Sequence, residues 1–264
     1  MSPRGGLLTP PQMRECLEAL RIRFDDVEVI NQRQNRIVIR WRQTPVGEPI
    51  IIKMWARPDL KGRLRRFFGM AACNYEWRNL LRMSRFGVSV PRPLGFCRVL
   101  PSIAGYTDVL FMEDLGGCES ASDHLKQLVQ AGKTEQALRF ENVLIDITEQ
   151  IVKAGMLDMD HGMNNIVVTS SGRTVKLDME LARRVSWPSL FTSMYGRMLG
   201  RLIGLHAFSV QPDIERNRRF SERLCNRLEP PPAALKKAGR YVRELMEQQR
   251  KEIGINTQVA FPWD

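Results

Sequence analysis

The stretch GMLDMDHGMNNIVV, residues 155–168, places two Asp, one His and two Asn residues close together before a run of β-branched residues. A surface turn needs only one or two such side chains. Carboxylates and imidazoles move protons, and carboxylate and amide oxygens bind hard metal ions. The density of these groups indicates a functional loop that leads into a strand.

Regular elements are predicted on both sides of this loop. Residues 137–155 carry apolar side chains at helical spacing and end in a glycine, as is typical of a helix C-terminus. The segments 165–168 and 174–178 flank the turn TSSGR and predict a hairpin. Helices are predicted again from near Leu190, with a break at the proline-rich segment 229–233.

The N-terminal half is predicted to be rich in strands. A short helix over 10–22 begins with a double proline, and residues 26–55 then contain three β-rich segments separated by turns, which predicts an antiparallel meander. Residues 71–87 form a predicted helix, followed by an extended segment (88–96) and a strand (108–115). One face of the helix over 71–87 carries four residues: Trp77, Leu80, Leu81 and Ser84.

Length and composition suit a soluble globular protein. The 264 residues suffice for one large domain or two lobes. No run of about 18 consecutive apolar residues occurs, and the start lacks the apolar core of a signal peptide, so a cytoplasmic protein is predicted. The five cysteines contain no C-x-x-C pair, which favours neither a disulfide framework nor a zinc site.

The net charge of +11 predicts an anionic partner: nucleic acid, an anionic membrane face or a phosphorylated substrate. The densest basic run, RPDLKGRLRRFFG (57–69), sets Arg63, Arg65 and Arg66 beside two phenylalanines. Such a run suits a membrane interface or phosphate contacts. A solvated loop or short helix is the alternative.

Residues suited to phosphoryl transfer occur in a fixed order along the chain. Lys53 lies in the strand segment IIIKMW, and Glu76 lies in the helix segment NYEWRNLL. A nucleoside triphosphate brings several negative charges, so its site needs a cation on a rigid strand and a carboxylate that holds this cation. Lys53 and Glu76 fit that pair.

The remaining groups lie around the predicted hairpin. Asn165 and Asp178 lie at its two ends, and magnesium takes oxygen ligands of this kind. Asp160 lies five residues before Asn165 and is suited to orient an attacking hydroxyl and accept its proton. Each residue alone is a common surface residue, and the D-x-x-x-x-N spacing also occurs by chance. The prediction depends on their joint order and on the type of element that carries each.

At these residues the chain resembles the protein-kinase-like superfamily, whose catalytic-loop and D-F-G motifs appear here as DMDHGMNN and DME, over about residues 26–210. The segments DMELA, GVSVPRPLGF and LFMEDLGG look more like the small-molecule branch than like protein kinases. The short length, the Arg-rich stretch and YEWRNLLRMSRFGVSVPRPLG look most like the bacterial lipopolysaccharide core kinases, which phosphorylate heptose or Kdo sugars.

This resemblance implies an α+β, bilobal protein-kinase-like fold. The expected N-terminal lobe, residues 1–111, has a leading helix and an antiparallel sheet, and the expected C-terminal lobe, residues 112–264, is mainly helical and begins with a hinge at 112–115. The expected cofactors are ATP and Mg²⁺. The expected acceptor is a sugar hydroxyl on an anionic glycolipid, reached by a cytoplasmic protein at the periphery of the inner membrane, with no specific nucleic acid partner.

The resemblance also assigns roles to individual residues. Asp160 is the expected base or hydroxyl-orienting group, and transfer is expected in a cleft between the lobes. Lys53, positioned by Glu76, is expected on the phosphates, and hinge backbone groups near Glu113 are expected to hold adenine. The expected magnesium ligands are Asn165 and Asp178.

Some features depart from the pattern and leave alternatives open. The loop NQRQN replaces a Gly-rich phosphate cover, Asp158 replaces the His of H-R-D, and Met179 and Glu180 replace Phe-Gly. A kinase of another small molecule or of protein is one alternative, and a catalytically silent kinase-like binding module is another. His161 is expected either to touch substrate or metal or to be a solvated turn residue.

Three glycines, at 196, 200 and 204, recur every fourth residue. This spacing is known from membrane helix pairs. Because arginines are interleaved and the run is short, tight helix packing within the C-terminal half is predicted instead.

Overall fold

A computed structural model describes residues 7–24, 27–56, 64, 67–68, 71–253, 257, 259 and 261. The arginines of the predicted basic run lie outside these residues. The chain divides into two compact units, one of residues 1–81 and 91–115 and the other of residues 82–90 and 116–264. The predicted lobe boundary after residue 111 stays a prediction.

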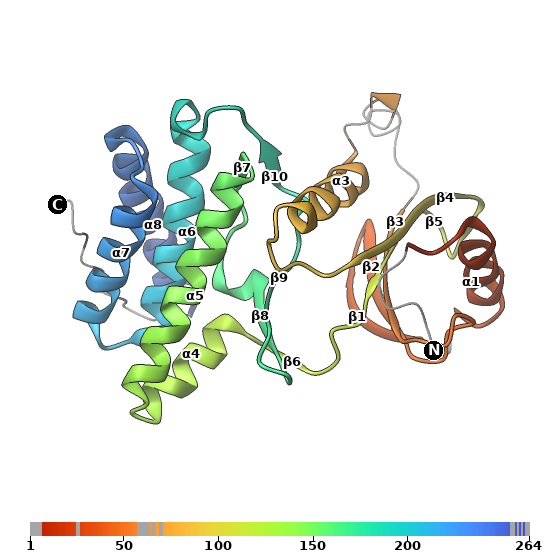
Figure 1. Ribbon diagram of the computed structural model, residues 1–264, viewed down its shortest axis with the longest axis horizontal. Coiled ribbons are helices and arrows are strands. Elements are labelled where there is room, and N and C mark those ends of the chain that lie inside the picture. The colour runs from red at the N-terminus through yellow and green to blue at the C-terminus, as the bar shows by residue number, and fades with distance from the viewer. Residues whose placement is uncertain are drawn as a thin grey trace. The chain divides into compact units, whose positions relative to one another are not determined.

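The first unit contains a five-stranded antiparallel sheet with strand order β1-β2-β3-β5-β4 (Figure 1). The predicted meander is confirmed as its first three strands. The strands are β1 (Glu28–Arg33), β2 (Arg36–Trp41), β3 (Ile50–Ala56), β4 (Pro93–Ile103) and β5 (Tyr106–Glu113).

Helix α1 (Pro10–Ile22) covers one face of this sheet (Figure 1). It begins with a capping box, in which the Thr9 hydroxyl accepts from the Gln12 amide and the Gln12 side chain accepts from the Thr9 amide. Its buried residues Cys16 and Leu20 join alternate residues of the strands, because side chains of a strand point to opposite faces in turn. Those strand residues include Ile37, Ile39, Trp41, Ile50, Ile52 and Met54.

Strand β1 forms an exposed edge of the sheet, with all six of its residues exposed. The strand is short and carries Glu28 and Arg33, and charged side chains discourage the pairing of edges between molecules.

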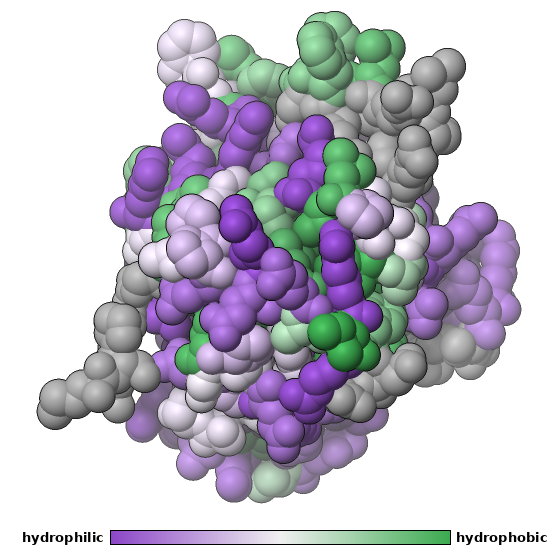
Figure 2. Space-filling view, turned by 90° about the vertical axis from the view of Figure 1, so that its right-hand side faces the viewer, coloured by the Kyte–Doolittle hydropathy of each residue, from purple (hydrophilic) through white to green (hydrophobic). Residues whose placement is uncertain are grey.

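Figure 2 shows hydrophilic side chains over most of one face of the molecule, with hydrophobic side chains interspersed among them.

Helix α3 (Ala72–Arg85) differs from the prediction in the face that it buries. Leu80 is buried as expected, but Trp77 and Leu81 are only half-buried and Ser84 is exposed. The buried face consists of Cys73, Glu76, Asn79, Leu80 and Met83. The apolar pattern missed this face because two of its members are polar residues that the fold buries.

The second unit is mainly helical, as predicted, and contains two small sheets (Figure 1). Its helices are α4 (Ala121–Gln130), α5 (Thr134–Lys153), α6 (Thr192–Val210), α7 (Ile214–Leu228) and α8 (Pro232–Ile253). One sheet has the order β6 (Cys118–Ser120), β8 (Ile166–Thr169), β9 (Thr174–Lys176), and the other pairs β7 (Met156–Asp158) with β10 (Ala182–Arg184). The predicted hairpin is β8 and β9, with Ile166 opposite Lys176.

The glycines of α6 allow close packing against α8, which runs alongside it (Figure 1). A Cβ atom on Gly196 would lie 2.6 Å from the carbonyl oxygen of Ala234, and one on Gly200 would lie 2.8 Å from that of Ala238. The prediction of tight helix packing is therefore confirmed. Among the residues that the structure describes, no helix is long and apolar enough to cross a membrane.

Candidate functional site

Lys53 and Glu76 form a buried ion pair in the first unit. The Lys53 ammonium lies 2.5 Å from Oε2 of Glu76, and the two residues are only 4% and 2% exposed. Lys53 lies between Ile52 and Met54 on β3 and therefore points to the face of the sheet away from α1. The predicted contact is present, and its role in binding phosphate stays a prediction.

Glu113 ends β5 at the segment predicted as the hinge. Its amide donates to the carbonyl of Arg92 at 3.0 Å, and it lies opposite Ile50 in the sheet. The next residue, Asp114, forms an ion pair with Arg40 at 3.0 Å. These contacts fix the backbone of this segment within the first unit. Adenine binding near Glu113 stays a prediction.

Asp160 and Asn165 contact each other directly in the loop between β7 and β8. Nδ2 of Asn165 donates to Oδ2 of Asp160 at 2.9 Å and to its carbonyl oxygen at 2.9 Å. A 3-10 turn over 163–165 brings Asn165 back to Asp160 across the five-residue spacing. Arg201 of α6 contacts the other oxygen, Oδ1, at 2.7 Å. Sequence reasoning did not identify Arg201.

Asp158, the residue in place of the H-R-D histidine, is fully buried. Its Oδ1 accepts from the amide of Asp160 at 3.0 Å. Its Oδ2 lies 2.9 Å from the ammonium of Lys176, which is also fully buried. Asp158 therefore replaces the histidine of the H-R-D pattern together with a cation. The buried ammonium of Lys176 neutralises the carboxylate that stands in place of the imidazole.

Asp178 lies in the loop after β9 rather than at the end of a strand, since β9 ends at Lys176. It adopts a left-handed φ of +50°, which is uncommon for a residue other than glycine. The amide of Leu177 donates to the carbonyl of Asn165 at 2.7 Å and so ties this loop to the one that carries Asp160.

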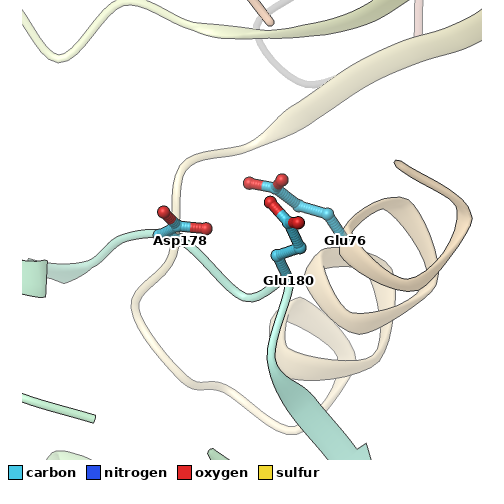
Figure 3. Close-up of side chains that lie close together, drawn as sticks. All are labelled: Glu76, Asp178 and Glu180. Carbon is cyan, nitrogen blue, oxygen red and sulfur yellow. The ribbon is translucent and has the colours of Figure 1, made fainter. Parts of the chain in front are cut away.

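Glu180 is a second carboxylate on the same loop. Figure 3 shows Asp178 and Glu180 projecting from this loop, and Glu76 projecting from α3. A carboxylate oxygen of Asp178 and one of Glu180 lie within 4.8 Å of each other. The guanidinium of Arg183 donates to the carbonyl of Glu180 at 2.8 Å and helps to fix the loop.

His161 is fully buried, so the expectation of a solvated turn residue is wrong. Thr148 donates its hydroxyl to the carbonyl of Leu144 at 2.7 Å, so it accepts from Nε2 of His161 at 2.9 Å. Burial, followed by the charge of Lys176, holds the pKa of His161 well below its ordinary value. The imidazole is therefore a neutral structural group beneath the loop.

Comparisons with known proteins identify the class and then the family. The antiparallel sheet, the helical unit and the two loops that carry Asp160 and Asp178 define an α+β protein-kinase-like fold, as predicted. A model of the lipopolysaccharide kinase (Kdo/WaaP) family matches residues 30–186, more than half of the chain. The chain belongs to this family and is a kinase, a phosphotransferase.

Solved structures agree on the fold. The structure of WaaP in complex with acyl carrier protein matches with a TM-score of 0.60 and 15% identity, covering 90% of this chain and 98% of that one. A Toxoplasma gondii rhoptry antigen kinase domain matches with a TM-score of 0.50 and 11% identity, covering 86% and 82% of the two chains. No match is found among curated proteins.

Proposed function

We propose that this kinase uses ATP and Mg²⁺ to phosphorylate a sugar hydroxyl of the lipopolysaccharide inner core. Membership of the lipopolysaccharide kinase family supports the class of acceptor. The observation that carries the chemistry is the contact between Asp160 and Asn165, because it holds a carboxylate and an amide oxygen in one fixed loop. These are the groups that phosphoryl transfer needs beside the acceptor and the metal.

The donor set of the second unit fits magnesium, which takes oxygen ligands and one or two carboxylates. Asn165 turns its amide nitrogen toward Asp160, which leaves its Oδ1 as the ligand atom. Asp178 and Glu180 supply carboxylates whose oxygens lie within 4.8 Å of each other. We assign Asn165 and Asp178 as the ligands, with Glu180 beside them. Bound magnesium neutralises charge on the phosphates.

Asp160 is assigned to the acceptor. It orients the sugar hydroxyl and takes its proton as the hydroxyl oxygen bonds to the γ-phosphorus. The bond from that phosphorus to the bridging oxygen breaks, and ADP leaves with the electron pair. A hydrogen bond from Asn165 and an ion pair with Arg201 hold the carboxylate. Such fixed geometry lowers the entropy cost of the reaction.

The first unit is assigned to the nucleotide. Lys53 neutralises phosphate charge, and its pairing with Glu76 on a neighbouring helix fixes the ammonium in position. Backbone groups near Glu113 are assigned to adenine. Because the Glu113 amide already donates to Arg92, other backbone groups of 112–115 are the proposed donors.

The net charge of +11 supports an anionic acceptor and peripheral contact with an anionic membrane face. A pocket for a cationic soluble substrate should instead be acidic. A cytoplasmic location at the inner membrane accords with this acceptor and is part of the proposal.

The test is the mass of a core glycolipid that lacks its phosphates, measured after incubation with purified protein and Mg-ATP. The expected result is a gain of one phosphate, which should be absent with Asp160→Ala. No gain despite measurable Mg-ATP binding would overturn the proposed acceptor in favour of a soluble one. No nucleotide binding at all would favour a silent kinase-like module.

A further inference from the structure

One face of α6 follows the loop that carries Asp160. Residues three or four apart share one face of a helix. Successive residues on this face of α6 therefore contact successive residues of the loop. Met198 accepts from the amide of Asp158 through its sulfur at 3.4 Å. Arg201 reaches Asp160, Leu205 lies over Gly162, and the Ser209 oxygen lies 3.8 Å from the sulfur of Met163.

The opposite face of α6 is fixed by α8. A Cβ atom on Gly196, Gly200 or Gly204 would lie under 3.0 Å from an atom of α8, so the two helices have no room to shift closer. Gly200 and Arg201 are neighbours in sequence, but Gly200 packs against α8 and Arg201 contacts Asp160 of the loop. The helix therefore presents Arg201 to the loop from a rigid support, as precise positioning requires.

Gly162 makes room for Arg201. Its φ of −139° and ψ of 162° are extended values that any residue adopts, so its conformation does not require glycine. A Cβ atom there would lie 2.5 Å from Cδ1 of Leu205, 3.2 Å from Nε of Arg201 and 3.3 Å from its Cγ. The absence of a side chain at 162 thus allows the arginine to pass over the loop and reach Asp160.

The ion pair fixes the direction of the Asp160 carboxylate. Arg201 contacts Oδ1 at 2.7 Å, and Asn165 donates to Oδ2 at 2.9 Å. With each oxygen held by a different element, rotation of the carboxylate would break one contact or both. The side chains of Arg201 and Asp160 are 26% and 27% exposed, so the pair is partly shielded from water while the carboxylate stays accessible.

We propose that Arg201 is a positioning residue for phosphoryl transfer, which holds Asp160 toward the acceptor hydroxyl from α6. This inference rests on the proposed function, since Asp160 must be the residue that acts on the acceptor. It adds to that function a residue outside the loop motifs, and it gives Gly162 a reason to be glycine.

The test compares Arg201→Gln, Arg201→Lys and Gly162→Ala with Arg197→Gln, the matched control. Arg197 lies one turn earlier on the same helix, is exposed and stacks on Tyr241 instead of contacting the loop. Steady-state kinetics with the core glycolipid and Mg-ATP give kcat and both KM values. Thermal unfolding of each variant reports whether the fold is retained.

Arg201→Gln is expected to lower kcat about 10²-fold, because a small misplacement of a reacting group has an effect of this size. The KM for Mg-ATP and the melting temperature should stay close to those of Arg197→Gln. Arg201→Lys should recover part of kcat, since it keeps the charge without the planar fork of arginine. Gly162→Ala should lower kcat in the same direction, because its Cβ atom would push Leu205 aside and crowd the Arg201 side chain.

Three results would overturn the inference alone, provided that the wild-type protein phosphorylates the glycolipid. One is an Arg201→Gln variant as active as Arg197→Gln. Another is a raised KM for the glycolipid with an unchanged kcat, which would make Arg201 a substrate-binding residue. The third is a loss of kcat that tracks unfolding and that lysine does not restore. Failure of the wild-type protein to transfer phosphate would instead overturn the proposed function, and the inference with it.

Discussion

The ammonium of Lys176 lies 2.9 Å from Oδ2 of Asp158, and both side chains are fully buried. The approach is that of an ion pair rather than a directed hydrogen bond. The same ammonium donates to the carbonyl of Leu177 at 2.6 Å, and the other oxygen of Asp158 accepts from the amide of Asp160. The pair therefore joins the segment that leads to Asp178 to the loop that carries Asp160.

Removing both members of this pair should destabilise the protein less than the sum of the costs of removing each alone. Lys176→Met leaves the Asp158 carboxylate buried without its cation, and such a change costs about 3–5 kcal/mol. The double variant Lys176→Met/Asp158→Asn should cost less than the sum of the two single variants. Denaturant unfolding of all four proteins measures this coupling, and additive costs would show that the two residues act independently.

Variants in the two loops should differ in whether they still bind Mg-ATP. Asp160→Ala should abolish phosphate transfer while Mg-ATP still binds, because Asp160 is assigned to the acceptor. Asp178→Ala should lose both, because Asp178 is assigned to the metal that holds the phosphates. Calorimetric titration with Mg-ATP beside the transfer assay distinguishes the two. Full activity in either variant would contradict the assignment of that residue.

Glu76→Gln should lower transfer by about 10²-fold or more, because Lys53 loses the carboxylate that holds it and preorganised charge is a large part of catalysis. Lys53→Met should have an effect at least as large. Lys153→Met is the control, since Lys153 is an exposed surface residue paired with Glu149. A Glu76→Gln variant with unchanged kcat would show that the pair serves stability alone.

Stability should fall as the pH drops below about 6.5. Burial holds the pKa of His161 well below 6.5, so the folded protein leaves it neutral while the unfolded chain takes up a proton. Its contribution is therefore intact above the unfolded pKa and is lost progressively below it. Burial also lowers the pKa of His206, although its hydrogen bond to the Glu141 carboxylate opposes this effect.

The check is the free energy of unfolding of the wild type and of His161→Gln at about pH 7.5 and about pH 5.5. The wild type should lose more stability than the variant between these values, because only the wild type carries the His161 imidazole. Equal losses in the two proteins would mean that His161 titrates alike in the folded and unfolded states.

Gly200→Ala should destabilise the packing of α6 against α8. The added Cβ atom would lie 2.8 Å from the carbonyl oxygen of Ala238, and a clash with backbone forces the helices apart at a cost of about 1–3 kcal/mol. Gly117→Ala is the control, since a Cβ atom there meets nothing within 4 Å. Equal melting temperatures for the two variants would contradict the close approach.

Much of the fold follows from patterns local in the sequence. The strands up to residue 56, the hairpin of β8 and β9 and the helix α8 follow from alternation, turn residues and helical periodicity. The contact between Asp160 and Asn165 was predictable because five residues and one turn separate them.

Other features depend on contacts between distant segments. Arg201 lies 41 residues after Asp160, and its contact with Asp160 depends on how α6 packs against the loop. Its one signal in the sequence is its place between the glycines that pack on α8. The burial of His161 and of Lys176 escaped prediction because a polar residue gives no apolar pattern, and only its partner explains its place in a core.

The most direct test of the central claim follows a phosphate from donor to acceptor. Dephosphorylated core glycolipid is incubated with the protein, magnesium and ATP whose terminal phosphate carries heavy oxygen, and the glycolipid is then analysed by mass spectrometry. The account predicts one added phosphate that retains the heavy label, on a sugar hydroxyl, and none with Asp160→Ala. A glycolipid of unchanged mass would contradict it, whether or not labelled phosphate is released to water.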